Sequence, residues 1–284
     1  MRLVSWNMQR GRGVDGRCDA ARAITQLRQA TDFDVLCLQE VSAGYTDLSG
    51  LNGADQFAQL RALLPEYEAV TGILTDIQPG MAPRQLFGNM LFSRYPVLQA
   101  TRHILPWPLD AEVKSTQRGV IETTLQTSLG PLRVSTTHLE YFSVLQRTAQ
   151  VERLRELHRE NALHARRPHP GQAGDGPFCA IPRAVPALLA GDCNFLPGGP
   201  EYQRLLAPFD DDVAPYCDAW SLRYPGQPAP PTVCLHERNA APWTFDYLFA
   251  TAALGEYITQ IRVLPEVMGS DHQPLLIELR ARAC

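Results

Sequence analysis

Short apolar runs that lead directly into polar side chains recur along this chain, and they constrain its fold more than any other feature. The segment LLAGDCN at 188–194 is the clearest example, because three apolar residues precede Asp192 and Asn194. Alternate side chains of an extended segment share a face, so Asp192 and Asn194 point one way and Cys193 the other. We therefore expect a buried strand that presents two oxygen-bearing side chains to one ligand.

Apolar runs bounded by turn residues predict eight strands, and helical periodicity predicts three helices. The predicted strands cover residues 2–6, 35–39, 89–93, 119–125, 132–137, 185–190, 245–250 and 275–279, and the predicted helices cover 19–30, 55–64 and 143–165. Between residues 67 and 138 strands follow one another without a helical pattern, which indicates antiparallel pairing.

Two segments, 166–183 and 208–243, are rich in proline and are predicted to be long loops, with disorder as an equal alternative for the first. We do not interpret them as linkers, because the polar strand ends on both sides of each segment belong to one set. A single domain over residues 1–284 is therefore expected, and this length is enough to bury a large core.

Composition excludes several classes of protein. The net charge of −4 gives no basic field that would hold a nucleic-acid backbone tightly. The seven cysteines are odd in number and contain no C-x-x-C pair, which argues against a disulfide framework or a zinc ribbon and favours a reducing compartment. With no apolar stretch of membrane-spanning length and no leader-like N-terminus, we expect a cytoplasmic protein without a membrane span or an obligate protein partner.

The polar groups at the strand ends are the types that bind a divalent cation and cleave a phosphoester. They are Asn7, Glu40, His138, Asp192, Asn194, Asp246, Asp271 and His272. Oxygen ligands favour Mg²⁺ or Mn²⁺, and no H-E-x-x-H motif indicates zinc. A cation can neutralise phosphate oxygens, while carboxylates and histidines prepare a water and stabilise the leaving alkoxide.

Each of these residues has an ordinary explanation when it is taken singly. Asp271 could begin a turn, His138 could be a hydrogen-bonded core histidine, and Glu40 could pair at a strand end. Their accumulation at the ends of apolar strands is harder to explain in this way, because every buried charge needs a partner. The sequence therefore predicts one shared site.

The motifs W-N, L-Q-E, T-H-L, G-D-x-N, F-D-Y and S-D-H occur in this order between Asn7 and His272. This ordered set resembles the endonuclease/exonuclease/phosphatase superfamily, which includes deoxyribonucleases, apurinic endonucleases, neutral sphingomyelinases and inositol-polyphosphate phosphatases. The resemblance implies an α/β fold of the four-layer αββα type, in which two mixed, mostly antiparallel sheets are flanked by helices.

The resemblance also implies a metal site that holds Mg²⁺ or Mn²⁺. Glu40 is similar to the principal metal ligand of the superfamily, with Asn7 and Asp271 nearby, directly or through water. Arg118 is a weaker candidate for a contact to the substrate phosphate, and a surface position explains it equally well.

The remaining motif residues resemble the catalytic groups of the superfamily. Asp192 is similar to the residue that orients or deprotonates the attacking water, and Asn194 to its neighbour that binds phosphate or metal. His272 resembles the histidine at the scissile phosphate, and Asp246 the carboxylate that holds its ring. His138 is similar to the phosphate-binding or leaving-group histidine. Whether Asp192 or His272 is the general base stays open.

The implied activity is metal-dependent hydrolysis of phosphoester bonds, with phosphodiesters, including nucleic acid or nucleotides, favoured over phosphatase or sphingomyelinase-like substrates. Loops at the strand ends are expected to set specificity, namely 106–118, 166–183 and 208–243. Their aromatic residues could stack on a base, line a lipid groove or simply anchor the loops; they are Trp107, Tyr216, Trp220 and Trp243.

Two other functional classes fit parts of the sequence. GRGVDG at 11–16 matches the G-x-G-x-x-G pattern of NAD- or FAD-binding oxidoreductases, but Asp15 would lie near the pyrophosphate and the chain lacks βαβ alternation. A non-catalytic scaffold on the same fold is the third class. It is disfavoured because every catalytic position matched by the resemblance is intact.

Overall fold

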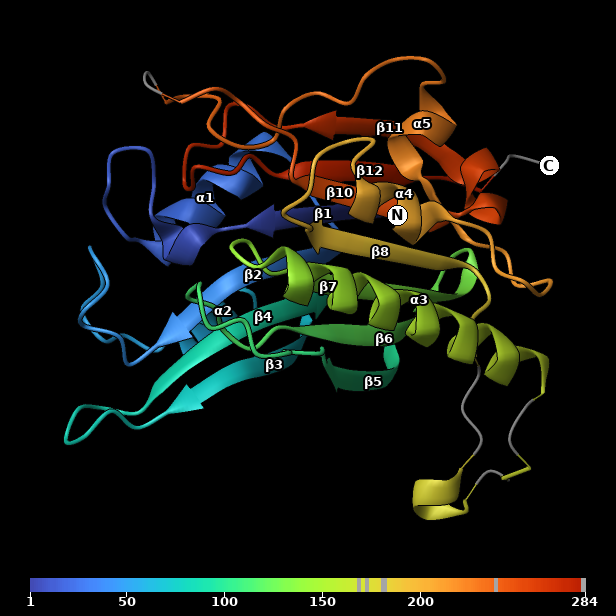
Figure 1. Cartoon of the computed structure of the whole chain (residues 1–284), viewed down its shortest axis with the longest axis horizontal. Helices are drawn as coiled ribbons and strands as arrows, with labels where there is room; N and C mark the ends of the chain where they lie inside the picture. Colours follow the sequence, from blue (N-terminus) through green and yellow to red (C-terminus); the bar gives the residue numbers. More distant parts are fainter. Residues whose placement is uncertain (168–169, 172–173, 180–182, 238–239, 282–284) are drawn as a thin grey trace.

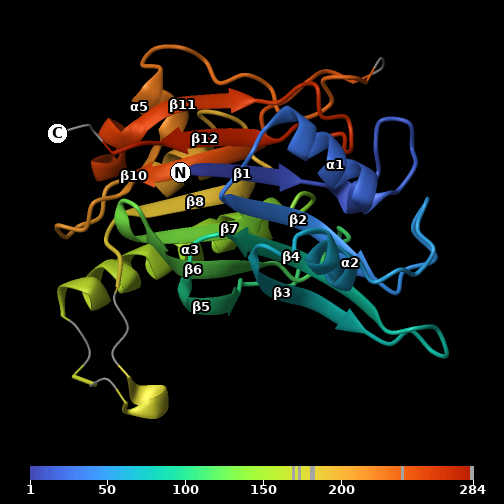
Figure 2. The same ribbon diagram turned by 180° about the vertical axis from the view of Figure 1, so that it is seen from behind.

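The computed structural model describes residues 1–167, 170–171, 174–179, 183–237 and 240–281. Two six-stranded sheets pack against each other (Figures 1 and 2). The first has the order β11-β12-β1-β2-β4-β3, with β1 Arg2–Asn7, β2 Val35–Ala43, β3 Glu68–Ile77, β4 Gln85–Ser93, β11 Ile258–Val263 and β12 Leu275–Leu279. The second has the order β5-β6-β7-β8-β10-β9, with β5 Val97–Ile104, β6 Gly119–Thr127, β7 Gly130–His138, β8 Ala187–Asp192, β9 Tyr216–Asp218 and β10 Asp246–Thr251.

Each sheet has one parallel pair, β1 with β2 and β7 with β8, and the other paired strands in the described residues are antiparallel. A helix connects the strands of each parallel pair, as this geometry requires. The connecting helices are α1 Ala20–Ala30 and α3 Val144–Arg166. The carboxyl ends of two parallel pairs are thereby available to build a site.

Three apolar clusters separate four layers. One cluster joins α1 and α2 (Gln56–Leu63) to the first sheet, and a second fills the space between the two sheets. The third joins α3 and α4 (Pro200–Leu206) to the second sheet. These layers confirm the expected αββα sandwich with mixed, mostly antiparallel sheets.

The predicted helices are all present, and side chains cap the first turns of α1 and α3. The Asp19 side chain accepts a hydrogen bond from the Arg22 amide, and the Ser143 side chain accepts one from the Gln146 amide. None of the described helices is long and apolar enough to cross a membrane.

All eight predicted strands are present, but four others were missed: β3, β5, β9 and β11. The prediction that 208–243 is wholly loop was also wrong, because this segment contains β9 and the short helix α5 Ala219–Arg223. In the other predicted loop, residues 168–169, 172–173 and 180–182 lie outside the described part, and 176–178 form one turn of 3₁₀ helix. Two more 3₁₀ turns cover Gln9–Gly11 and Ala252–Tyr257.

Candidate active site

The carboxyl ends of both parallel pairs meet at one cavity of about 890 Å³. Asn7 is the last residue of β1, His138 of β7 and Asp192 of β8, and Glu40 lies in β2. Seven of the eight predicted metal and catalytic residues line this cavity, and so does Arg118. Asp246, at the start of β10, is buried behind His272.

A β-bulge presents Glu40 to the cavity. The register between β2 and β4 shifts between Leu38 and Val41, and the Glu40 backbone has a left-handed φ of 58°. Bulges re-aim side chains, and a non-glycine residue at such a φ stores backbone strain. The strained backbone therefore serves to turn this carboxylate out of the regular strand.

Gly191 allows β8 to approach β7 closely just before Asp192. Its φ is 152°, and a Cβ atom at this position would lie 1.9 Å from the Thr137 carbonyl oxygen. Only glycine tolerates both the conformation and the approach. The approach matters for the site because the next register pair along these strands is His138 with Asp192.

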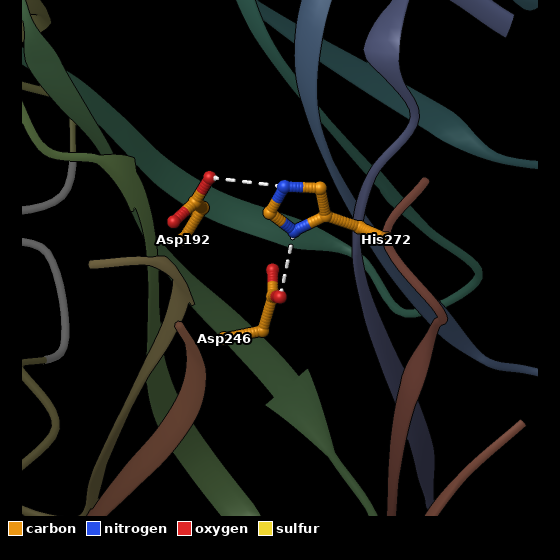
Figure 3. Close-up of side chains that lie close together, drawn as sticks. All are labelled: Asp192, Asp246 and His272. Carbon is orange, nitrogen blue, oxygen red and sulfur yellow. Dashed lines mark hydrogen bonds and ion pairs between the residues drawn. The ribbon is translucent and has the colours of Figure 1, made fainter. Parts of the chain in front are cut away.

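Asp192, Asp246 and His272 form a buried cluster (Figure 3), whose ligand atoms lie within 4.8 Å of one another. Asp246 pairs with Asp192 across β10 and β8, which would leave two carboxylates side by side. The His272 ring lies between them: Nδ1 is 2.8 Å from Asp246 Oδ2, and Nε2 is 3.8 Å from Asp192 Oδ2. Thr232 Oγ1 also donates to Asp246 Oδ2, at 2.7 Å.

Asp192 is the common neighbour of the other groups. Its Oδ2 accepts a hydrogen bond from Asn7 Nδ2 at 2.9 Å and lies 3.4 Å from His138 Nε2. Its Oδ1 accepts from the Asn194 amide at 3.1 Å. The carboxamide of Asn194 instead donates to the Leu139 carbonyl, so this side chain fixes the turn that follows β8.

Burial and neighbouring charges shift the pKa values of these groups in different directions. Burial raises the pKa of the Asp192 carboxyl. Burial alone would lower the pKa of His272, but the carboxylates of Asp246 and Asp192 outweigh it and raise that pKa. Burial, together with the Arg118 charge, holds the pKa of His138 well below its usual value. The arrangement thus favours a cationic His272 and a neutral His138 at neutral pH.

Two of the predicted metal ligands, Glu40 and Asp271, offer carboxylate oxygens at the same cavity, whereas the Asn7 oxygen accepts a hydrogen bond from the Gln9 amide. Asn7 Nδ2 donates to Glu40 Oε1 at 3.1 Å, and burial raises the pKa of Asp271. Two side chains from the turn after β1 pair with these carboxylates: Arg10 with Glu40, and Gln9 with Asp271. The donor set fits a hard divalent cation, provided that Arg10 shares Glu40 with it or moves away.

A model of the endonuclease/exonuclease/phosphatase family matches residues 4–272. This chain belongs to that family. Family members include phosphatases, nucleases and phosphodiesterases, and no curated protein matches the sequence of this one.

Solved structures of other family proteins share its fold. An endonuclease/exonuclease/phosphatase from Beutenbergia cavernae is 24% identical, with a TM-score of 0.66 over 99% of this chain and 71% of its own. A mannosyl-6-phosphatase from Bacteroides thetaiotaomicron is 17% identical, with a TM-score of 0.64 over 99% of this chain and 100% of its own. The catalytic domain of human Nocturnin, solved with a bound sulfate anion, is 18% identical, with a TM-score of 0.61 over 99% of this chain and 94% of its own.

Sequence reasoning missed several residues that line or border the site of this family member. Gln9 and Arg10 were not singled out, although only Met8 separates them from the W-N motif. Arg147 on α3 lines the cavity and pairs with Glu201, as Arg118 pairs with Glu140. Neither the family motifs nor apolar periodicity identifies these pairs, because each joins distant segments.

The aromatic residues singled out from the sequence lie in different places. Trp243 lines the cavity, whereas Tyr216 is buried behind it in the third apolar cluster. Trp220 packs on the cluster between the sheets. Trp107 is half exposed on the loop before β6, where its indole N–H donates to Ser115.

The glycine-rich segment at 11–16 has a local structural role in this endonuclease/exonuclease/phosphatase fold. Asp15 within it pairs with Arg22 of α1, and Asp19 occupies the capping position where a phosphate would sit. Each sheet contains a single parallel pair within the described residues, not the repeated βαβ units of a dinucleotide-binding fold.

Proposed function

We propose that this chain is a divalent-metal-dependent hydrolase of phosphoester bonds that acts by preference on phosphodiesters. The observation that carries the proposal is the convergence of six distant segments on one cavity, with Asp192 in contact with groups from both sheets. Phosphoester hydrolysis needs a base, a charge to meet the phosphate oxygens and a donor for the leaving group. A single domain over residues 1–284 remains part of this proposal, and the apolar cluster shared by the two sheets supports it.

In the proposed mechanism Asp192 takes the proton of the attacking water. Its pKa is raised by burial, so the carboxylate accepts a proton more readily than an exposed aspartate does. The Asn7 amide and the Asn194 backbone N–H hold the two carboxylate oxygens in place. This assignment makes Asp192 the general base and leaves His272 for charge stabilisation.

His272 in its cationic form stabilises negative charge on the phosphate oxygens. Asp246 holds its Nδ1–H, so Nε2 faces the cavity and Asp192. His138 presents Nε2 beside Asp192, and its lowered pKa keeps it neutral, which suits a hydrogen-bond partner of the phosphate or leaving group better than a fixed charge. Arg118 would contact the substrate phosphate, and its position in the wall of the same cavity supports this role.

Glu40, Asn7 and Asp271 would hold the cation, Mg²⁺ or Mn²⁺. When bound, such a cation neutralises phosphate oxygens and lowers the barrier to attack by water. The cluster of Asp192, Asp246 and His272 also has ligand-like spacing. Its His272 nitrogens, however, already face two carboxylates, which favours the hydrogen-bonding role.

The test is hydrolysis of bis-p-nitrophenyl phosphate and p-nitrophenyl phosphate, each with Mg²⁺, with Mn²⁺ and with a chelator. We expect turnover that requires the cation, is faster with the diester, and falls at least a hundredfold in Asp192→Asn. Absence of turnover on both substrates with either cation would contradict the proposal. Faster turnover of the monoester would indicate that the protein is a phosphatase and not a phosphodiesterase.

A further inference from the structure

One side of the cavity is apolar and partly exposed. The apolar wall is formed by Tyr141, Phe142, Leu196, Trp243 and Phe245. The first four expose 45–53% of their surface, although each is a large hydrophobic side chain beside a polar catalytic centre. Contiguous exposed apolar surface lowers the solubility of a protein, so where it occurs it commonly marks a binding site.

The apolar surface continues outside the cavity. Val144 and Leu145, in the first turn of α3, are more than half exposed, and so are Trp107 and Leu109 in the loop 106–118. We call these four residues the rim. The loop is fastened to the start of α3, because Gln146 donates to the Pro108 carbonyl and Ser143 to the Asp110 carboxylate.

The distribution of exposed hydrophobic residues is uneven. The part of the chain that the structure describes exposes 17 large hydrophobic side chains, and eight of them belong to the apolar wall or the rim. Leu196 follows the end of β8 and Trp243 precedes β10, so the eight residues come from four separate segments. Their concentration around one cavity is a property of the fold and not of one hydrophobic stretch.

The described lining residues of the cavity lack the features that bind a polynucleotide. Both arginines among the described lining residues, Arg118 and Arg147, are already paired with buried glutamates. The lining also carries the carboxylates of Glu40, Asp192 and Asp271. A strand of phosphates needs a track of unpaired cations, so the charge pattern favours a substrate with one phosphate group.

A nucleobase also fits the apolar wall poorly. Base recognition uses hydrogen bonds to the base edges as well as stacking. Among the described groups near the wall, the Arg147 guanidinium is engaged by Glu201 and by the carbonyls of Glu140 and Tyr141. The Asn194 carboxamide is engaged by the Leu139 carbonyl. The Lys114 ammonium lies 4.8 Å from the centre of the Phe142 ring, so the described part of the wall offers hydrocarbon contact beside one cation.

We propose that the substrate is an amphiphilic phosphodiester whose hydrocarbon chain lies along the apolar wall, and that the rim contacts the lipid surface from which it comes. This inference rests on the proposed phosphodiesterase activity and names its substrate class. Each buried methylene contributes about 0.8 kcal/mol, so two or three buried methylenes give at least a tenfold gain in kcat/KM.

The experiment compares three diesters that share the p-nitrophenyl leaving group: methyl, octyl and thymidine 5′ p-nitrophenyl phosphate. We expect kcat/KM for the octyl diester to exceed that for the methyl diester at least tenfold, and to exceed that for the thymidine diester. Leu196→Asp, in the apolar wall, should reduce the octyl-to-methyl ratio several-fold, whereas the double rim variant, Leu145→Asp combined with Leu109→Asp, tests the contact with the lipid surface. Ile77→Asp, an equally exposed position on β3 away from the cavity, should keep the wild-type ratio.

Co-sedimentation with phosphatidylcholine vesicles, performed without metal, gives a readout that is independent of turnover. Wild-type protein and Ile77→Asp should sediment with the vesicles, and the double rim variant should not. Equal kcat/KM for the octyl and methyl diesters, a preference for the thymidine diester, or wild-type protein that stays in the supernatant would overturn the inference. In each of these cases, turnover of the methyl diester would still support the proposed phosphodiesterase function. No turnover of any diester would overturn both that function and the inferred substrate class.

Discussion

The Nδ1 atom of His272 lies 2.8 Å from Oδ2 of Asp246, and this contact fixes which ring nitrogen faces the cavity. The acceptor is itself held by Thr232, and its other oxygen has no partner among the described groups. A carboxylate here both orients the imidazole and stabilises its cationic form.

Replacement of that carboxylate tests its role. In Asp246→Asn the ring loses its charged partner, and we expect kcat to fall by about 10²–10⁴ while the protein stays folded. Steady-state kinetics and thermal melting measure the two effects. Asp218→Asn is the matched control, since Asp218 is a buried carboxylate on the neighbouring strand that does not line the cavity, and it should change kcat only slightly. A variant at Asp246 with more than a tenth of the wild-type rate would contradict this role.

Two substitutions at the predicted metal ligand should shift cation affinity in opposite directions. Glu40→Gln removes a charged oxygen ligand and should weaken Mn²⁺ binding more than tenfold. Arg10→Ala removes the cation that pairs with Glu40 and should tighten Mn²⁺ binding several-fold, because like charges repel across a short distance. Isothermal titration without substrate measures both, with Arg28→Ala, whose partner Glu66 is exposed, as the control. Equal affinities in all three variants would place the cation elsewhere.

Gly191→Ala should destabilise the fold and not merely the site. The added Cβ would overlap the Thr137 carbonyl oxygen, so the two strands must separate, and we expect a loss of roughly 3 kcal/mol or more in the free energy of unfolding. Gly130→Ala shares the left-handed backbone but meets no atom within 4 Å, and about 1 kcal/mol is expected there. Urea denaturation of the two variants separates the clash from backbone strain.

His158 makes stability depend on pH in the mildly acidic range. Burial, assisted by the Arg133 charge, lowers its pKa from 6.5 to about 4. The unfolded chain therefore binds a proton that the native state does not bind. The stability that the neutral His158 ring contributes is fully present above pH 6.5 and is lost as pH falls towards 4. The loss amounts to about 3 kcal/mol. His158→Gln should flatten the stability curve by that amount between these pH values, and an unchanged slope would refute the assignment.

The strands that sequence reasoning missed share one position: β3, β5, β9 and β11 are the four edges of the two sheets. An edge strand such as β5 is only partly covered, so its residues alternate weakly and form no apolar run. The central strand β8 is buried along its whole length and is evident from its sequence. Apolar patterning thus identified the interior of each sheet and not its limits.

The residues of the site were predictable as a set because they follow apolar strands in a family-specific order. Their contacts were not, since pairs such as His272 with Asp246 or Asn7 with Asp192 depend on register across sheets. The bulge at Glu40 was also hidden, because VLCLQEVSA continues as an unbroken strand sequence. Arg10 reaches the site because its backbone is left-handed, and the sequence has no glycine or asparagine at this position that would indicate such a turn.

The hydrogen bond from Asn7 to Asp192 spans the two sheets, with one partner at the tip of each central parallel pair. The reacting groups are consequently divided between the two sheets, and the distances between these groups depend directly on how the sheets are aligned. A shift of one sheet over the other by even a single residue would separate the base from the metal ligands. Neither sheet would yet have lost its own inter-strand hydrogen bonds. Catalysis should therefore be the first property to fail when the interior between the sheets is loosened.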